Sequence, residues 1–214
     1  MNKTNEGNQQ GTRNQIMEAA GKLFAANGLE KTSTREITDA AGTNVASVNY
    51  HFGSKENLFK EVVRDCARAC QKDRMEVLAA CRARGDDFAQ TLRAFVRVHV
   101  GMITGTHGSG ADVAIFFREL SNPGPGFDII LEEMIKPTHK VLTELFMANV
   151  PAMTKEKATL SIFSLMGQMM HVVRGGKIIP RLLEKELDEE FVDKICDHIV
   201  DYSLWGMCGK AATK

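Results

Sequence analysis

Apolar side chains recur at one-turn spacing along most of this chain, which is the pattern of amphipathic helices. The first such stretch begins near Thr12 and meets a helix-stopping pair at Asn27-Gly28. Further stretches follow at residues 34–41, 45–52, 55–78, 86–103, 113–120, 127–145, 155–174 and 191–205. The pattern therefore predicts an all-α protein of about nine helices.

Two of these expected helices are short and lie next to each other. Ser33-Thr-Arg-Glu36 has the spacing of a capping box, in which each side chain accepts the backbone N–H of the other residue. Gly42 ends that helix after two turns, and Asn44 is a good N-cap for the helix over 45–52. Two short helices joined by a tight turn at a glycine form a helix-turn-helix.

The expected helix over 45–52 has an outer face suited to a DNA groove. Val48 and Phe52 lie four residues apart and should point into a small core, which leaves the other side chains toward solvent. Small and polar outer side chains can reach base edges and thymine methyl groups, and larger ones can reach the flanking phosphates. The candidate DNA contacts are Ser33, Thr34, Arg35, Thr43, Asn44, Val45, Ala46, Ser47, Asn49, Tyr50, His51 and Lys55.

The stretch from about Thr12 to Phe59, centred on TSTREITDAAGTNVASVNYHFGSKENLF, resembles the DNA-binding domain of the TetR family of bacterial transcriptional regulators. The resemblance implies that residues 45–52 form the recognition helix, that Tyr50 and His51 lie against the DNA backbone, and that Lys55 binds a phosphate. The residue pairs at 43–44 and 48–49 differ from those that are usual in this family. The resemblance therefore implies no particular operator sequence. Further on, RELSNPGPGFDIILEEMIKP resembles the subgroup with CecR-type effector domains.

The patterns divide the chain into three expected parts. A polar segment over 1–11 should be a disordered tail, residues 12–57 a helix-turn-helix domain, and residues 58–214 a helical domain for effector binding and dimerisation. Prolines and glycines break the chain sharply over 122–126, and Pro137 should kink the helix that follows.

The helix over 155–174 is apolar on nearly all sides, so its own core and a second surface must both cover it. Together with the helix over 191–205 and the same pair from a second copy, it could close a four-helix bundle. A homodimer of this kind is what a reader of palindromic half-sites needs. The expected dimer interface consists of Leu160, Phe163, Met169, Val173, Ile195, Ile199, Tyr202 and Trp205.

Methionine and aromatic residues of the larger domain indicate an adaptable apolar cavity, although ordinary core packing explains any one of them as well. His99 could equally be a satisfied core histidine, and Arg118 could pair with a nearby carboxylate. The effector is expected to be small and largely apolar. The candidate pocket residues are Phe95, His99, Met102, Phe117, Arg118, Met134, Met166 and Met170.

Composition narrows the class of function. In the 214 residues, 27 basic side chains balance 27 acidic ones, which argues against nonspecific coating of nucleic acid but not against reading a short site. The five cysteines form no CxxC pair, and the GTHGSG segment at 105–110 fits neither a phosphate loop nor a nucleophile elbow. No catalytic residue, metal or cofactor is therefore predicted. No apolar run approaches the roughly 20 residues of a membrane helix, so a cytoplasmic protein without membrane contact is expected.

The sequence thus predicts a homodimeric transcriptional regulator, a repressor that a ligand releases from a palindromic site in double-stranded DNA. Two alternatives stay open. The first is a DNA-binding or interaction protein of the same fold that takes no ligand, and a structure without an enclosed cavity would favour it. The second is a helical enzyme, for which the sequence offers no nucleophile–base pair and no metal spacing.

Overall fold

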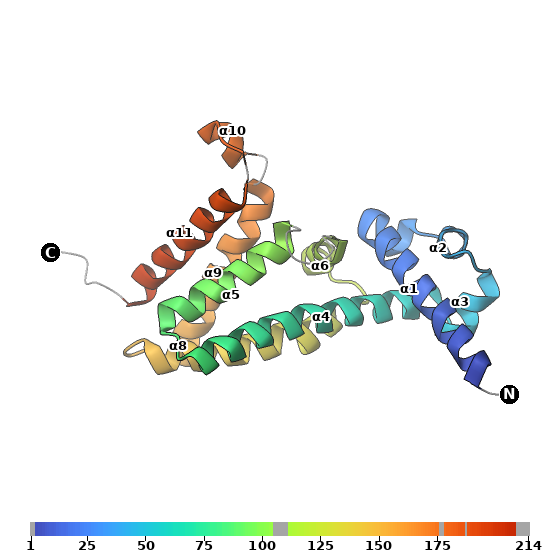
Figure 1. The fold of residues 1–214 in the computed structure, drawn as a ribbon, viewed down its shortest axis with the longest axis horizontal. Helices are drawn as coiled ribbons and strands as arrows, with labels where there is room; N and C mark the ends of the chain where they lie inside the picture. The colour runs from blue at the N-terminus through green and yellow to red at the C-terminus, as the bar shows by residue number, and fades with distance from the viewer. Residues whose placement is uncertain (1–2, 105–110, 176–177, 187, 209–214) are drawn as a thin grey trace. The chain divides into compact units, whose positions relative to one another are not determined.

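The computed structural model describes residues 3–104, 111–175, 178–186 and 188–208. Every regular element in these ranges is a helix (Figure 1), which confirms the all-α prediction. The chain forms two compact units. The first contains Met1–Ala69 and Ser109–Met134, and the second contains Cys70–Gly108 and Ile135–Lys214. The long helix α4 (Lys55–Arg84) contributes one half to each unit. The GTHGSG segment lies outside the described residues.

The first unit is built around α1 (Lys3–Lys31), which packs against α2 (Thr34–Ala41), α3 (Val45–Phe52) and α6 (Ala111–Ser121). Its core contains Phe24 and Phe59, whose rings meet edge to face with centroids 5.1 Å apart. Other fully buried side chains from α1 to α4 complete this core, namely Ile16, Ile37, Val48 and Leu58.

Helix α1 starts earlier than expected and is interrupted where expected. It begins at Lys3, so residues 3–11, expected to be a disordered tail, are helical in this structure. Polar residues one turn apart can pair along a helix, as Gln10 does by donating to Asn14 at 3.1 Å. At the other end Gly28 has φ +81° and ψ 172°, which interrupts the regular helix.

The proline-glycine segment between α6 and α7 (Phe127–Ile130) is held by a buried carboxylate. Glu119 is 6% exposed, and its Oε2 accepts the backbone N–H of Gly126 at 2.8 Å. A Cβ atom on Gly126 would lie 2.9 Å from Val63, so this segment packs where a side chain does not fit.

Pro137 interrupts the helix that follows, as the sequence predicted, but the interruption takes the form of a π-helical turn. Helix α7 runs into a π-helix, η1 (Leu131–Ile135), and then into α8 (Lys136–Asn149), with the proline in the first turn of α8. Proline cannot donate the backbone hydrogen bond of a regular helix, and its ring clashes with the carbonyl four residues earlier. The wider π-turn accommodates both restrictions.

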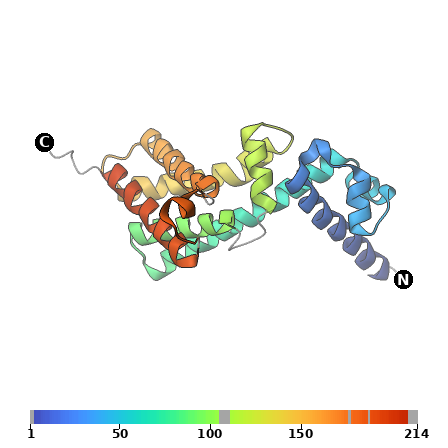
Figure 2. The same cartoon turned by 90° about the horizontal axis from the view of Figure 1, so that it is seen from above.

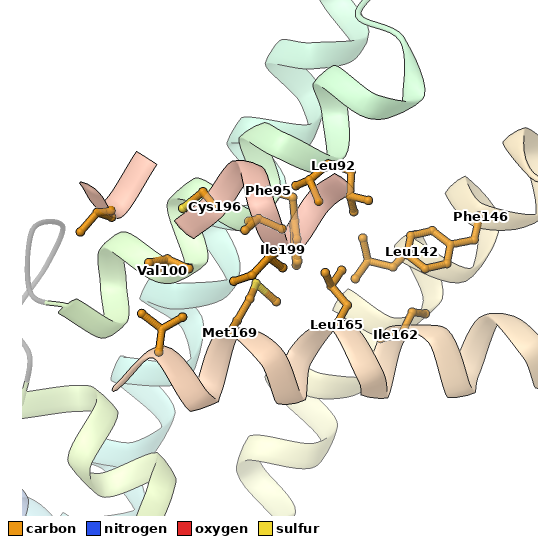
Figure 3. Close-up of a cluster of buried hydrophobic side chains, with 14 of the residues drawn as sticks. Leu92, Phe95, Val100, Leu142, Phe146, Ile162, Leu165, Met169, Cys196 and Ile199 are labelled. Atoms are coloured by element: carbon orange, nitrogen blue, oxygen red, sulfur yellow. The ribbon is translucent and has the colours of Figure 1, made fainter. Parts of the chain in front are cut away.

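The second unit packs α5 (Phe88–Thr104), α8, α9 (Lys155–Gly175) and α11 (Glu189–Cys208) around one apolar core. Helices α9 and α11 lie side by side (Figures 1 and 2). The core side chains converge between these helices in Figure 3, and they include Leu92, Phe95, Leu142, Phe146, Leu165, Met169 and Ile199. The short helix α10 (Ile179–Leu183) was not predicted. None of the described helices has the length and apolar character that a membrane span requires.

Candidate DNA-binding surface and regulatory core

The turn between α2 and α3 is fixed by local caps. The Ser33 hydroxyl accepts the Glu36 N–H at 3.2 Å, and the Glu36 carboxylate accepts the Ser33 N–H at 2.7 Å, which confirms the predicted capping box. Hydrogen bonds from Ser33 lower the pKa of Glu36, because they favour its charged form. Gly42 takes the left-handed conformation at φ +64°, and Asn44 caps α3 by accepting the Ser47 N–H at 3.1 Å. These caps set where α3 begins.

Helix α3 has one buried face and one exposed face. Val48 and Phe52 are buried, as the spacing predicted. Val45 is 45% exposed and Tyr50 is 71% exposed, and Ala46 and Asn49 are exposed as well. We call Val45, Ala46, Asn49 and Tyr50 the α3 outer face. Exposed apolar and aromatic groups beside an amide suit contact with the floor and walls of a DNA groove.

Several other candidate DNA contacts already have partners inside the turn. The Asn44 side-chain oxygen accepts from both the N–H and the hydroxyl of Ser47, so both side chains are engaged in capping. The Thr43 hydroxyl is buried, with no partner in the described part of the chain, and is not presented to solvent. Arg35 is exposed and lies 4.0 Å from Asp39, a distance at which its guanidinium stays free to move. Ser33 is exposed and Thr34 is half-buried.

Lys55 differs from the expectation of a simple phosphate contact. Its ammonium donates to the backbone carbonyls of Leu29 and Thr32, each at 2.8 Å, and the side chain is half-buried. The carbonyls at a helix end have no backbone N–H from a following turn to accept. The Lys55 ammonium donates to these two carbonyls instead. An ammonium has three donors, so one remains for another acceptor. Lys55 therefore anchors the end of α1 to the start of α4.

Sequence reasoning missed Arg13, because no local pattern marks it. Its guanidinium pairs with Glu61 at 3.0 Å, and its central carbon lies 5.1 Å from the centre of the Phe52 ring. These contacts join α1 to α3 and α4. The surface pocket beside them is rich in cationic groups and is lined by Arg13, His51, Phe52, Asn57, Lys60, Glu61 and Arg64.

Arg118, a candidate pocket residue, has another role. It extends from α6 to the end of α1, where Nη1 donates to the Phe24 carbonyl at 3.0 Å. Its guanidinium lies so close to Gly28 that a Cβ atom there would be 2.5 Å from Nη1. Arg118 therefore caps a helix of the first unit, and its place in an effector pocket stays a prediction.

Comparison with known proteins identifies both parts of the chain. Residues 16–62 match the family described as "Bacterial regulatory proteins, tetR family", and residues 88–207, more than half of the chain, match "HTH-type transcriptional dual regulator CecR, C-terminal domain". The chain belongs to the TetR family and carries a CecR-type C-terminal domain. The members of this family that it resembles are transcriptional regulators rather than enzymes, and the chain spans about half the length of the first of these relatives.

Individual relatives and structures agree with this assignment. The HTH-type transcriptional repressor KstR2 of Rhodococcus jostii (strain RHA1) is 33% identical over 112 residues, which span 52% of this chain and 52% of that relative. SCO4454, a TetR-family transcriptional regulator from Streptomyces coelicolor, has a TM-score of 0.68 at 19% identity, covering 94% of this chain and 97% of its own. AibR in complex with isovaleryl coenzyme A and operator DNA has a TM-score of 0.68 at 20% identity, covering 89% and 97%. At such identities the two structures establish the fold alone.

The candidate pocket residues are not gathered in one unit of this TetR-family regulator. Phe117 and Arg118 lie in the first unit, because α6 packs on α1, and Met134 of η1 lies in the first unit as well. The other five lie in the second unit, where three are buried and two are half-buried, namely Phe95, His99, Met102, Met166 and Met170.

The expected dimer interface divides into exposed and buried side chains. Leu160 and Phe163 of α9 and Tyr202 and Trp205 of α11 are each more than 60% exposed. Met169 was wrongly assigned, and so was Ile199, because these two side chains point toward each other inside the core (Figure 3). Ile195 is half-buried against the same core, and the Val173 side chain lies outside the described residues. A surface pocket on α11 is lined by His198, Asp201, Tyr202, Trp205 and Gly206.

The core of the second unit contains a polar pair, of which the sequence analysis predicted only one member. His99 was a candidate, but Arg74 was missed because a lone arginine in the predicted helix resembles a surface residue. Arg74 Nη2 lies 2.9 Å from His99 Nδ1, and both side chains are 5% exposed. Burial, and then the charge of Arg74, hold the pKa of His99 well below its usual range. His99 is therefore neutral, and its Nδ1 accepts from Arg74.

Thiol and metal chemistry find little support in the described residues. Burial raises the pKa of Cys196 to about 11, which keeps this thiol protonated and unreactive near neutral pH. No group of three or more His, Cys, Asp or Glu side chains is placed to hold a metal ion in the described ranges.

Proposed function

We propose that this regulator binds a palindromic DNA operator as a homodimer, and that it is a repressor released by a small molecule. The main support for DNA binding is the α3 outer face. It combines exposed side chains that can meet base edges with a helix start fixed by the Asn44 cap. The cationic pocket around Arg13 and Lys60 provides groups that could position a phosphate backbone beside it.

The exposed apolar side chains of α9 and α11 support a homodimer. Leu160, Phe163, Tyr202 and Trp205 lie on two helices that pack against each other. Large apolar groups gathered on adjacent helices mark an interaction surface more often than a solvated one. A two-fold copy of this pair would bury them in a four-helix bundle. The half-sites of a palindromic operator lie about one helical turn, roughly 34–36 Å, apart, and a dimer would supply one α3 helix for each.

Ligand release is the finer part of the proposal, and the second unit supports it through its buried polar pair and half-buried methionines. AibR, which has a related fold, was solved with isovaleryl coenzyme A and operator DNA together. A small molecule that favours one conformation of the second unit would change operator affinity by population shift, and the operator would change ligand affinity by the same factor.

Selection from a random DNA library with purified protein, at near-physiological salt, tests the proposal. We expect enrichment of a two-fold symmetric site, and loss of that enrichment in a variant with the α3 outer face replaced, such as Asn49→Ala combined with Tyr50→Ala. Lys72→Ala, an exposed substitution in the second unit, is the matched control and should select the same site. Failure of folded, dimeric protein to enrich any sequence would refute operator binding. Enrichment that no metabolite pool reverses would favour a ligand-independent DNA-binding protein.

A further inference from the structure

The core of the second unit contains a guanidinium that forms no ion pair with a carboxylate of the described residues. Arg74 of α4 is 5% exposed, and its Nε is buried with no hydrogen-bond partner. Nη2 meets the neutral ring of His99. Asp73, the preceding residue, acts on the guanidinium through its charge, but no carboxylate of the described residues lies within ion-pair distance of Arg74. Buried charges in proteins are normally paired, because an uncompensated one is costly to remove from water.

Two arginines of α5 in this unit are paired with carboxylates. Arg93 lies 2.7 Å from Asp197 and 3.1 Å from Asp201, and Arg97 lies 2.8 Å from Asp193. These arginines are a third or more exposed, so they need their partners least. Arg74 is far more buried than these two arginines, so it needs a counter-charge more than they do, yet no carboxylate of the described residues lies within ion-pair distance of it.

Deprotonation does not remove the buried positive charge of Arg74. Burial lowers its pKa, but a guanidinium stays charged in proteins. Its planar fork has five N–H donors, and the orphaned Nε–H shares one edge of that fork with an Nη group. An edge of this kind is the part of arginine that binds a carboxylate or phosphate through two parallel hydrogen bonds.

The surroundings on α5 are apolar. The Phe95 ring stacks on His99, with centroids 6.2 Å apart and planes inclined by 19°. Val96, Val100 and Met102 are also buried on the same helix. On α4, Gln71 lies one turn before Arg74 and accepts from Thr138 of α8 at 2.7 Å, which ties this face of α4 to α8. A ligand held here would have its anionic group at Arg74 and its apolar part against aromatic and aliphatic side chains.

We propose that Arg74 is the anion-binding residue of the effector site, so that the effector is a small apolar molecule carrying a carboxylate or phosphate. This inference rests on the proposed ligand-responsive function and refines it, since a purely apolar effector would leave Arg74 uncompensated. His99 orients the guanidinium by accepting from Nη2, and its neutral state leaves the positive charge on Arg74 alone.

Thermal melting of the full-length protein tests the inference with defined probes. Decanoate and decyl phosphate carry the two anionic groups, and decanol is the neutral control of equal chain length. We expect both anions, or the one whose geometry fits, to raise Tm by roughly 5 °C or more well above the dissociation constant, and decanol to do much less. The probe that raises Tm shows whether the site binds a carboxylate or a phosphate.

Three variants localise the effect. Arg74→Met should abolish the anion-dependent rise in Tm, and without probe it should melt at or above wild type, because an unpaired buried charge is removed. Arg74→Lys, which keeps the charge but loses the fork, should keep a reduced rise and serves if the methionine variant does not fold. Arg82→Met, an exposed substitution two turns further along α4, should respond as wild type does.

Two outcomes would overturn the inference. One is an unchanged wild-type Tm with both anions, and the other is an Arg74→Met protein that still responds as wild type. Binding of the selected duplex, measured without probe on the same preparations, separates this failure from failure of the proposed function. If the protein binds its duplex but neither anion changes its Tm, the proposed DNA binding stands and the anionic effector is refuted. If the protein binds no duplex, the proposed DNA binding is refuted, and the melting series still decides whether Arg74 binds anions.

Discussion

Replacing Gly28 by alanine should destabilise the first unit through the end of α1. Gly28 has φ +81° and ψ 172°, a region of backbone space that is almost confined to glycine. Holding an L-residue there costs about 1–3 kcal/mol. The new Cβ atom would also lie 2.5 Å from Arg118 Nη1 and would displace the hydrogen bond to the Phe24 carbonyl, which contributes about 1 kcal/mol. The expected loss in the free energy of unfolding is about 2–4 kcal/mol.

Urea unfolding followed by circular dichroism, at fixed protein concentration, measures this loss. Gly21→Ala is the matched control on the same helix. The nearest atom to its new Cβ would be Val62 Cγ1 at 3.8 Å, so alanine fits and should stabilise by about 0.5–1 kcal/mol. A double-mutant cycle isolates the steric part. Because the methyl group of Gly28→Ala already displaces the guanidinium, Arg118→Met should have little further effect in that background. A Gly28→Ala loss no larger than about 0.5 kcal/mol, or fully additive losses for the pair, would refute the reasoning.

Three other expectations concern dimerisation, base preference and pH. Trp205→Asp should weaken self-association by roughly thirtyfold or more in sedimentation equilibrium, since a central interface tryptophan commonly contributes ~2 kcal/mol to binding. Met147→Asp, at another exposed apolar position of the second unit, should leave self-association unchanged. Asn49→Ala should change the preferred base and lose about 1–3 kcal/mol at the best site in competition binding, whereas Asn149→Ala should select the same sequence. Folding holds His99 neutral, so below its ordinary pKa of 6.5 the unfolded chain binds a proton that the folded chain does not. The free energy of unfolding should therefore fall from pH 7 to pH 5, by up to about 1.4 kcal/mol per unit below 6.5, and His99→Gln should flatten the fall.

Features determined within one or two turns of the chain could be predicted from the sequence. The Ser33–Glu36 capping box, the Asn44 cap and the interruption at Gly28 each depend on residues at most three positions apart. The buried and exposed faces of α3 follow from helical periodicity in the same way. The helix-turn-helix and the α3 outer face were therefore accessible from the sequence alone.

Features that depend on how helices pack were not accessible. Helix α9 is apolar around most of its circumference, so its sequence alone could not separate Met169, which is buried, from Phe163, which is exposed. Arg118 acts on a carbonyl 94 positions away, and no spacing rule connects them. Arg74 was overlooked because a charged residue on a helix is normally solvated, and only the packed core shows that this one is not.

The end of α1 shows why α6 belongs structurally with the helix-turn-helix. Two cations meet carbonyls there, Lys55 at Leu29 and Thr32, and Arg118 at Phe24. Positive charges at a helix C-terminus are favourable, because they satisfy carbonyls that the helix leaves unpaired and oppose its dipole. One cation comes from α4 and the other from α6, so the position of α1 relative to α2 and α3 depends on both helices. A fragment ending at residue 57 would retain Lys55 but lose Arg118 and the Glu119-held segment after it. The compact unit that contains α3 therefore includes residues 111–134, and movement of α6 would be transmitted directly to the helix that supports α2 and α3.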